Sequence, residues 1–199
     1  MKPLTCLTPA FYFNATVKTI LPLGDLNTGG QLILGRGISG KLTSERGYGV
    51  QLSANLEYVT DYPTIDPSGA ISRIDIRGLV VPDDQSTPLQ IQVTGIQESS
   101  AEVFGVVSSQ VNTGQRIPYG STNRGKSLHP ELHDVSDHPI LVAHVEFRGG
   151  SAKYSKLQNG LFVGSSTVSS GPGDGEFTFG LKIMEVLSTK SNVVIGQEL

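Results

Sequence analysis

The stretch ILVAHVEFRGGSAKYSKLQNGLFVG, Ile140 to Gly164, decides the fold that the sequence predicts. Its first part alternates between two phases of side chains, and a period of two is typical of a β-strand. These phases are Leu141, Ala143, Val145 and Phe147, and Val142, His144, Glu146 and Arg148. Two glycines then end the strand, Ser151 can cap a short helical turn, and an apolar strand resumes at Leu161. The stretch therefore predicts two strands joined by a helical turn.

Similar strand patterns recur along the chain, and turns rich in glycine and proline separate them. The sequence contains 24 glycines and 11 prolines, and helical periodicity is almost absent. This rhythm is typical of antiparallel all-β proteins, either a closed barrel or a sandwich. Strands are expected at residues 10–19, 31–43, 49–60, 71–80, 88–97, 101–108, 140–148, 160–168 and 176–187.

Length and composition describe one globular domain, residues 1–199. Hydrophobic residues make up 37% of the chain and charged residues 17%, which differs from the composition of disordered proteins. The net charge is −3 and the basic residues are scattered, so neither nucleic acid nor a membrane surface is an expected partner. Cys6 is the single cysteine, which excludes an intramolecular disulfide. Without a signal peptide or membrane-spanning run, we expect a soluble, cytoplasmic protein.

Two segments interrupt the strand pattern. Residues 109–139 form a long irregular region, which in a compact domain is typical of a lid, an oligomer contact or a disordered segment. Residues 188–199 form a polar C-terminal tail that could reach a partner subunit. Edge strands and such an arm favour a homo-oligomer, for example a C2 dimer.

Gly35, Gly37 and Gly40 match the dinucleotide-binding spacing G-x-G-x-x-G. That function requires a helix to begin at the glycines, because the pyrophosphate binds at its N-terminus. Residues 41–49 leave no room for a helix before the next strand. The glycines therefore predict a kinked barrel strand, and no cofactor is expected.

Four histidines provide a weak metal-site hypothesis. They are His129, His133, His138 and His144, with Asp134 and Asp137 near by. Two of them stand four residues apart, but no ligand spacing is complete and the segment resembles a loop. We therefore expect solvated loop histidines and no metal.

In each of two expected strands, charged residues lie on the same face. Arg73 and Asp75 share a face of the strand at 71–80, and His144 and Glu146 share a face of the strand at 140–148. On an outer barrel wall such a pattern is ordinary. If these side chains faced the interior, burial would separate their pKa values and supply a general acid and a general base. The candidate catalytic residues are then Asp75 or Glu146 as base, His144 as acid or orienting group, and Arg73 as oxyanion stabiliser.

Further residues could complete such a pocket by binding substrate. Tyr12 and Asn55 could position polar substituents of the substrate. The apolar remainder of the pocket could be lined by three aromatic residues, Phe104, Phe162 and Phe179.

Three stretches resemble a family of small microbial β-barrels, domain of unknown function 3237, grouped by shape with allene oxide cyclase and lipocalins. Pro9–Phe13 is similar to its opening strand, and Tyr58–Asp61 followed by Ile71–Gly78 is similar to its central hairpin. Lys153–Gly164 resembles a late element of the family. The resemblance implies a single antiparallel barrel of about eight to nine strands.

The same resemblance implies a role in natural-product pathways. Similar barrels act as cofactor-independent cyclases or isomerases that fold a small hydrophobic polyketide- or terpenoid-like intermediate into one stereoisomer, for example by intramolecular hydroalkoxylation or pericyclic closure. The alternatives are a lipocalin-like binding protein for a hydrophobic metabolite and a structural oligomer. The chain departs from the family pattern at Gly49–Gln51, Glu57 and Lys156–Gln158, so no residue role is transferred.

Overall fold

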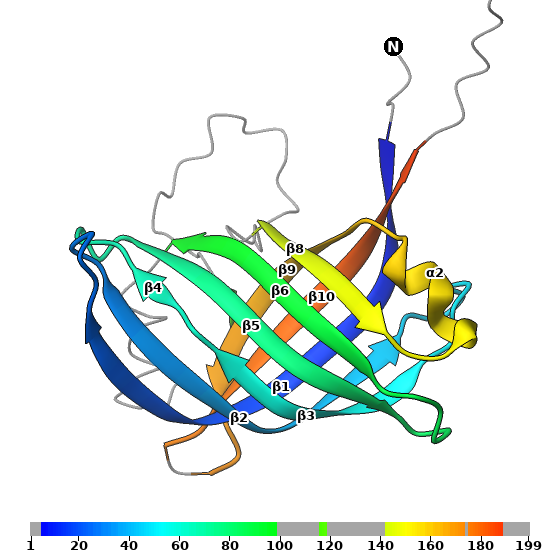
Figure 1. Ribbon diagram of the computed structural model, residues 1–199, viewed down its shortest axis with the longest axis horizontal. Coiled ribbons are helices and arrows are strands. Elements are labelled where there is room, and N and C mark those ends of the chain that lie inside the picture. Colours follow the sequence, from blue (N-terminus) through cyan, green and yellow to red (C-terminus); the bar gives the residue numbers. More distant parts are fainter. Residues whose placement is uncertain (1–4, 99–115, 119–141, 174, 189–199) are drawn as a thin grey trace, which may run out of the picture.

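The computed structural model describes residues 5–98, 116–118, 142–173 and 175–188, which form a closed antiparallel β-barrel (Figure 1). The wall consists of β1 (Thr5–Asp25), β2 (Gln31–Ser44), β3 (Ser53–Asp61), β5 (Ile71–Pro82), β6 (Leu89–Glu98), β8 (Val142–Gly149), β9 (Phe162–Ser170) and β10 (Phe177–Ser188). Short β4 (Thr64–Ile65) pairs with β2 and β5, and short β7 (Arg116–Pro118) pairs with β9. The order around the wall is β1-β10-β9-β8-β6-β5-β3-β2, and β1 pairs with β2 to close the ring. The predicted all-β barrel is confirmed.

The observed strands match the expected ones, with differences at their ends. β1 extends from Thr5 to Asp25 because its first half pairs with β10 and its second half continues along β2. The expected strand at 101–108 lies outside the described residues. Within the expected irregular region 109–139, the described part is β7. None of the helices in the described segments is long and apolar enough to cross a membrane.

Between β8 and β9 the chain forms a short helical plug. It comprises η1 (Ala152–Tyr154) and α2 (Ser155–Gln158), and α2 lies at one end of the barrel (Figure 1). Tyr154 and Leu157 are each 1% exposed and belong to the hydrophobic core. The predicted helical turn is confirmed, and Ser151 occupies its N-cap position. The cap is made by the main-chain oxygen of Ser151, which accepts a hydrogen bond from the Tyr154 N–H at 2.9 Å, and not by its side chain.

Aromatic side chains fill the barrel half beside this plug. The ring centroids of Phe11 and Phe147 are 5.5 Å apart, and those of Phe147 and Phe162 are 5.4 Å apart in an edge-to-face arrangement. All three side chains are almost fully buried. Edge-to-face packing adds to the free energy gained from burying such large apolar surfaces. This half of the barrel is therefore a packed core.

β2 runs without a break through Gly35, Gly37 and Gly40, which confirms the predicted glycine-containing strand. No helix begins at these glycines. A side-chain carbon at Gly40 would lie 2.5 Å from the main-chain oxygen of Asn14, so the β1 backbone approaches this position too closely for any other residue. Glycine here allows the two strands to pack tightly.

β3 contains a β-bulge opposite β5. Glu57 pairs with Leu79 and Thr60 pairs with Arg77, so three steps along β3 match two steps along β5. Tyr58 lies in the bulge with a φ of 52° and its side chain is 82% exposed. A positive φ is unfavourable for a bulky residue, and a bulge re-aims the side chains that follow it.

The bulge reverses which residues of β3 face the interior. Before it, Leu56 is buried, and strict alternation from there would turn Tyr58 inward and Asp61 outward. Instead Val59 is the next buried residue, and Asp61 follows it on the inner face. A carboxyl group therefore enters the barrel.

We predict that Gly40→Ala destabilises the protein by about 1–3 kcal/mol, because the β1 backbone must shift to admit the methyl group. Gly49→Ala is the matched control, since a side-chain carbon there would contact nothing within 4 Å. Urea unfolding measures both variants. Equal stability of the two would contradict the close approach at Gly40.

We predict that Tyr58→Gly raises the free energy of unfolding by about 1 kcal/mol, because glycine adopts a positive φ without strain. Glu57→Gly, one residue earlier in the same strand, should instead lower it by roughly 0.5–1 kcal/mol. Thermal unfolding followed by circular dichroism gives both signs. A loss of stability in Tyr58→Gly would show that the bulge does not strain this residue.

Candidate functional site in the barrel interior

The half of the barrel away from the plug contains a cavity of about 290 Å³. This volume is at the lower end of the range for small-molecule sites. Gly35 and Gly37 of β2 lie in its wall, and a side-chain carbon at Gly37 would lie 2.7 Å from Val59 Cβ. Most of the wall is apolar and includes Val17, Ile33, Ile74, Ile76, Phe177 and Phe179. The cavity can therefore hold a small, largely apolar molecule.

Asp61 places a carboxyl group in this apolar wall. Its Oδ1 accepts a hydrogen bond from the main-chain N–H of Asp75 at 3.3 Å. Burial is the main cause that raises the pKa of Asp61, main-chain N–H groups lower it and the negative charge of Asp75 raises it, and together they bring it from 3.8 to about 7. Near neutral pH the group therefore occurs in both its protonated and its ionised form.

Two buried neutral polar side chains lie in the same cavity wall, which also includes the exposed Gln31. Ser72 of β5 and Gln97 of β6 are direct cross-strand partners, and they are 7% and 4% exposed. A hydroxyl and an amide can each donate and accept a hydrogen bond. Together with Asp61 they give the cavity one acid–base group and two orienting groups.

The candidate catalytic residues from the charged strand phases lie on the outer wall. The side chains of His144 and Glu146 on β8 are 44% and 40% exposed, and those of Arg73 and Asp75 on β5 are 57% and 32% exposed. None of the four is among the described residues that line the cavity. The inward orientation that their catalytic role requires is not found, because the opposite phase of each strand is apolar and faces the core.

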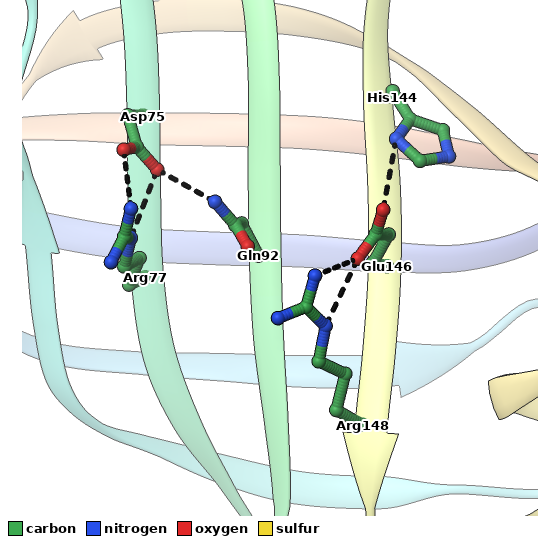
Figure 2. Close-up of polar contacts among 6 residues, drawn as sticks. All are labelled: Asp75, Arg77, Gln92, His144, Glu146 and Arg148. Atoms are coloured by element: carbon green, nitrogen blue, oxygen red, sulfur yellow. Dashed lines mark hydrogen bonds and ion pairs between the residues drawn. The ribbon is translucent and has the colours of Figure 1, made fainter.

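The outer-wall residues form local ion pairs (Figure 2). Asp75 accepts hydrogen bonds from Arg77 at 2.8 and 3.1 Å and from Gln92 at 3.1 Å, and the pairing with Arg77 lowers the pKa of Asp75. Glu146 lies between His144 Nδ1 at 3.6 Å and Arg148 Nε at 3.0 Å. Such exposed pairs contribute little to stability, typically about 0–1 kcal/mol each.

The candidate substrate-binding residues separate into different regions. Phe179 lines the cavity, whereas Phe162 is buried in the packed half beside the plug. Asn55 is exposed and donates a hydrogen bond to Asp83 at 3.4 Å, and Tyr12 follows the outward phase of β1. Phe104 lies outside the described residues.

Sequence reasoning missed the polar residues of the cavity for different reasons. Ser72 shares its phase with Ile74, Ile76 and Val80, so the apolar character of that phase could have identified it as inward-facing. Asp61 could not be found by alternation, because the bulge that turns it inward has no glycine or other simple marker in the sequence.

Within the described residues, no group of three or more His, Cys, Asp and Glu side chains could hold a metal ion. His129, His133 and His138 lie outside the described residues. His144 is on the outer wall, where its Nδ1 lies 3.6 Å from Glu146 Oε1.

We predict that Asp61 makes stability depend on pH. Its folded-state pKa of about 7 exceeds the unfolded value near 3.8, so the folded protein binds the additional proton between these values. Stability should therefore fall as pH rises from about 4 to about 7, by roughly 2–4 kcal/mol. Asp61→Asn should remove this decrease. Urea unfolding at pH 4.5 and 8.5 measures it, and an unchanged pH dependence in the variant would contradict the assignment.

Comparison with known proteins agrees with the barrel fold. A protein with unknown function from Clostridium acetobutylicum is 19% identical with a TM-score of 0.63, and the match covers 94% of this chain and 99% of that chain. A conserved protein of unknown function from Rhodopseudomonas palustris is 17% identical with a TM-score of 0.62, and the match covers 94% of this chain and 100% of that chain. A β-barrel-like protein from Acinetobacter baumannii is 18% identical with a TM-score of 0.59, and the match covers 94% of this chain and 99% of that chain. At these identities the likeness shows the fold alone.

The family comparison covers nearly the whole chain. No curated protein matches this chain. The family model described as protein of unknown function (DUF3237) matches residues 5–186, from the start of β1 to near the end of β10. The chain therefore belongs to the DUF3237 family.

Proposed function

We propose that this protein is a cofactor-independent isomerase or cyclase that acts on a small, largely apolar molecule held in the barrel cavity. The observation that carries the proposal is the carboxyl group of Asp61 in a largely apolar cavity wall. An acid–base group is most effective when its pKa lies near the working pH, and that of Asp61 is about 7. A role in polyketide or terpenoid biosynthesis is part of the proposal.

In the proposed reaction, Asp61 transfers a proton within the substrate. The ionised carboxylate takes a proton from a carbon or hydroxyl of the bound molecule, and the resulting carboxylic acid returns it at another position. Atoms and charge balance, because the product is an isomer. Ring closure by addition of a hydroxyl across an alkene follows the same scheme. Ser72 and Gln97 orient the oxygen atoms, while the apolar wall selects one folded conformer of the substrate.

A simple ketone tests this proposal without knowledge of the natural substrate. We predict that the protein accelerates exchange of the α-hydrogens of 2-tetralone in D2O, followed by proton NMR. Asp61→Asn should reduce the acceleration by about 100-fold or more, the usual contribution of one acid–base group. Full activity in this variant would refute the role of Asp61.

Two variants of the outer wall are the matched controls for this experiment. His144→Ala and Glu146→Gln alter ionisable groups that are outside the cavity, so exchange should be unchanged. Loss of exchange in one of them, with exchange unaffected in Asp61→Asn, would show that the catalytic residues are the charged residues of the outer wall and not Asp61.

The second candidate is a lipocalin-like binding protein for a hydrophobic metabolite. The predominance of apolar side chains in the cavity wall favours it. The same ketone experiment separates the two functions, since a carrier would bind 2-tetralone and leave its rate of exchange equal to that in buffer.

A further inference from the structure

The charges around the cavity are distributed unevenly. Among the described residues that line it, Asp61 is the single ionisable side chain. Arg73 and Lys18 each adjoin a lining residue in sequence and have acidic partners: Arg73 Nε lies 3.6 Å from Asp66, and Lys18 Nζ lies 3.2 Å from Glu176. An anionic ligand would therefore enter an apolar space without a counter-ion and lie beside a carboxyl group, which is strongly unfavourable.

The groups that face Asp61 come from the elements packed against β3. Its cross-strand partners are Gly35 on β2 and Ile76 on β5, and neither is ionisable. The nearest charge is the carboxylate of Asp75, which belongs to the outer wall and is paired there with Arg77. The remaining lining residues from β1, β4, β6 and β10 are apolar or neutral. The main-chain N–H of Asp75 stabilises a negative charge on Asp61, but none of the described residues that line the cavity is cationic.

We infer that the cavity binds a neutral molecule that presents a carbonyl or similar acceptor oxygen to the protonated carboxyl group of Asp61. A protonated carboxyl group has one O–H donor, and in an apolar wall that donor requires an acceptor. Ser72 and Gln97 supply additional neutral donors at the same site. This inference deepens the proposed function, on which its catalytic meaning rests, but binding itself requires no turnover.

A cationic amine is the alternative ligand for Asp61, because it would bind the ionised carboxylate and not the protonated carboxyl group. The two ligand classes differ in the direction of their pH dependence. A neutral ketone loses its donor as Asp61 ionises, so its affinity falls above the pKa of Asp61. An amine gains its counter-ion over the same range, so its affinity rises.

Three ligands with the same ring system distinguish these classes: 2-tetralone, 2-aminotetralin and 1,2,3,4-tetrahydro-2-naphthoate. Their dissociation constants are measured by NMR titration of the isotope-labelled protein at pH 5.5 and 8.5. With a pKa of about 7, the dissociation constant of the ketone should rise by about 30-fold between these values. The carboxylate should not bind at pH 8.5, and the amine should bind more weakly than the ketone at pH 5.5.

Two variants assign the pH dependence to one residue. Asp61→Asn retains a hydrogen-bond donor that cannot ionise, so it should bind 2-tetralone with the same affinity at both pH values. Glu146→Gln, the matched control, should keep the pH dependence of the parent protein because its carboxyl group is on the outer wall, is paired with Arg148 and does not line the cavity.

The inference is overturned if 2-tetralone fails to bind at pH 5.5, if its affinity does not depend on pH, or if the dependence persists in Asp61→Asn. If the amine binds more tightly than the ketone at pH 5.5, the inference is overturned in favour of a cationic ligand. Binding of the ketone as described, without exchange of its α-hydrogens, would support the inference while the proposed isomerase function fails.

Discussion

Closure of the sheet through β1 is the constraint on which the rest of the structure depends. β1 pairs with β10 on one edge and with β2 on the other, so the described wall closes on itself without a free edge. Each wall strand then has one inner and one outer face, and the interior must be filled by side chains or left as a cavity. In this protein both occur, because aromatic residues and the helical plug fill one half and the other half contains the cavity.

Much of the fold could be predicted from sequence because this constraint leaves a clear mark. Strands appear as alternating segments, and the apolar phase of each strand identifies the inner face. In β8 that phase is Ala143, Val145 and Phe147, all of them buried, while His144 and Glu146 follow the outer phase. The apolar phase of a strand is thus a better guide to its inner face than the charged phase is to a site, and in β8 it assigns the charged residues to the outer wall.

The candidate site could be predicted only in part. Phe179 was expected in the pocket and does line the cavity, since it follows simple alternation. Asp61 follows a bulge, and the phase of a strand beyond a bulge cannot be deduced by counting from its start. The pairing that reveals the extra residue is between β3 and β5, and such pairing is a property of the folded sheet rather than of one segment. The residue with the most distinctive chemistry was therefore the one least accessible to sequence reasoning.

The bulge at Tyr58 also bears on how such cavities can diversify. In a strand of strict alternation, the side chain delivered to this part of the interior would be the hydroxyl of Thr60 in place of the carboxyl group of Asp61. Loss of the bulge with the sequence unchanged would thus exchange the chemistry of the interior, because Thr60 would take the place of Asp61 opposite Ile76. A barrel of this kind can acquire a new reactive group through a change in strand pairing as well as through substitution.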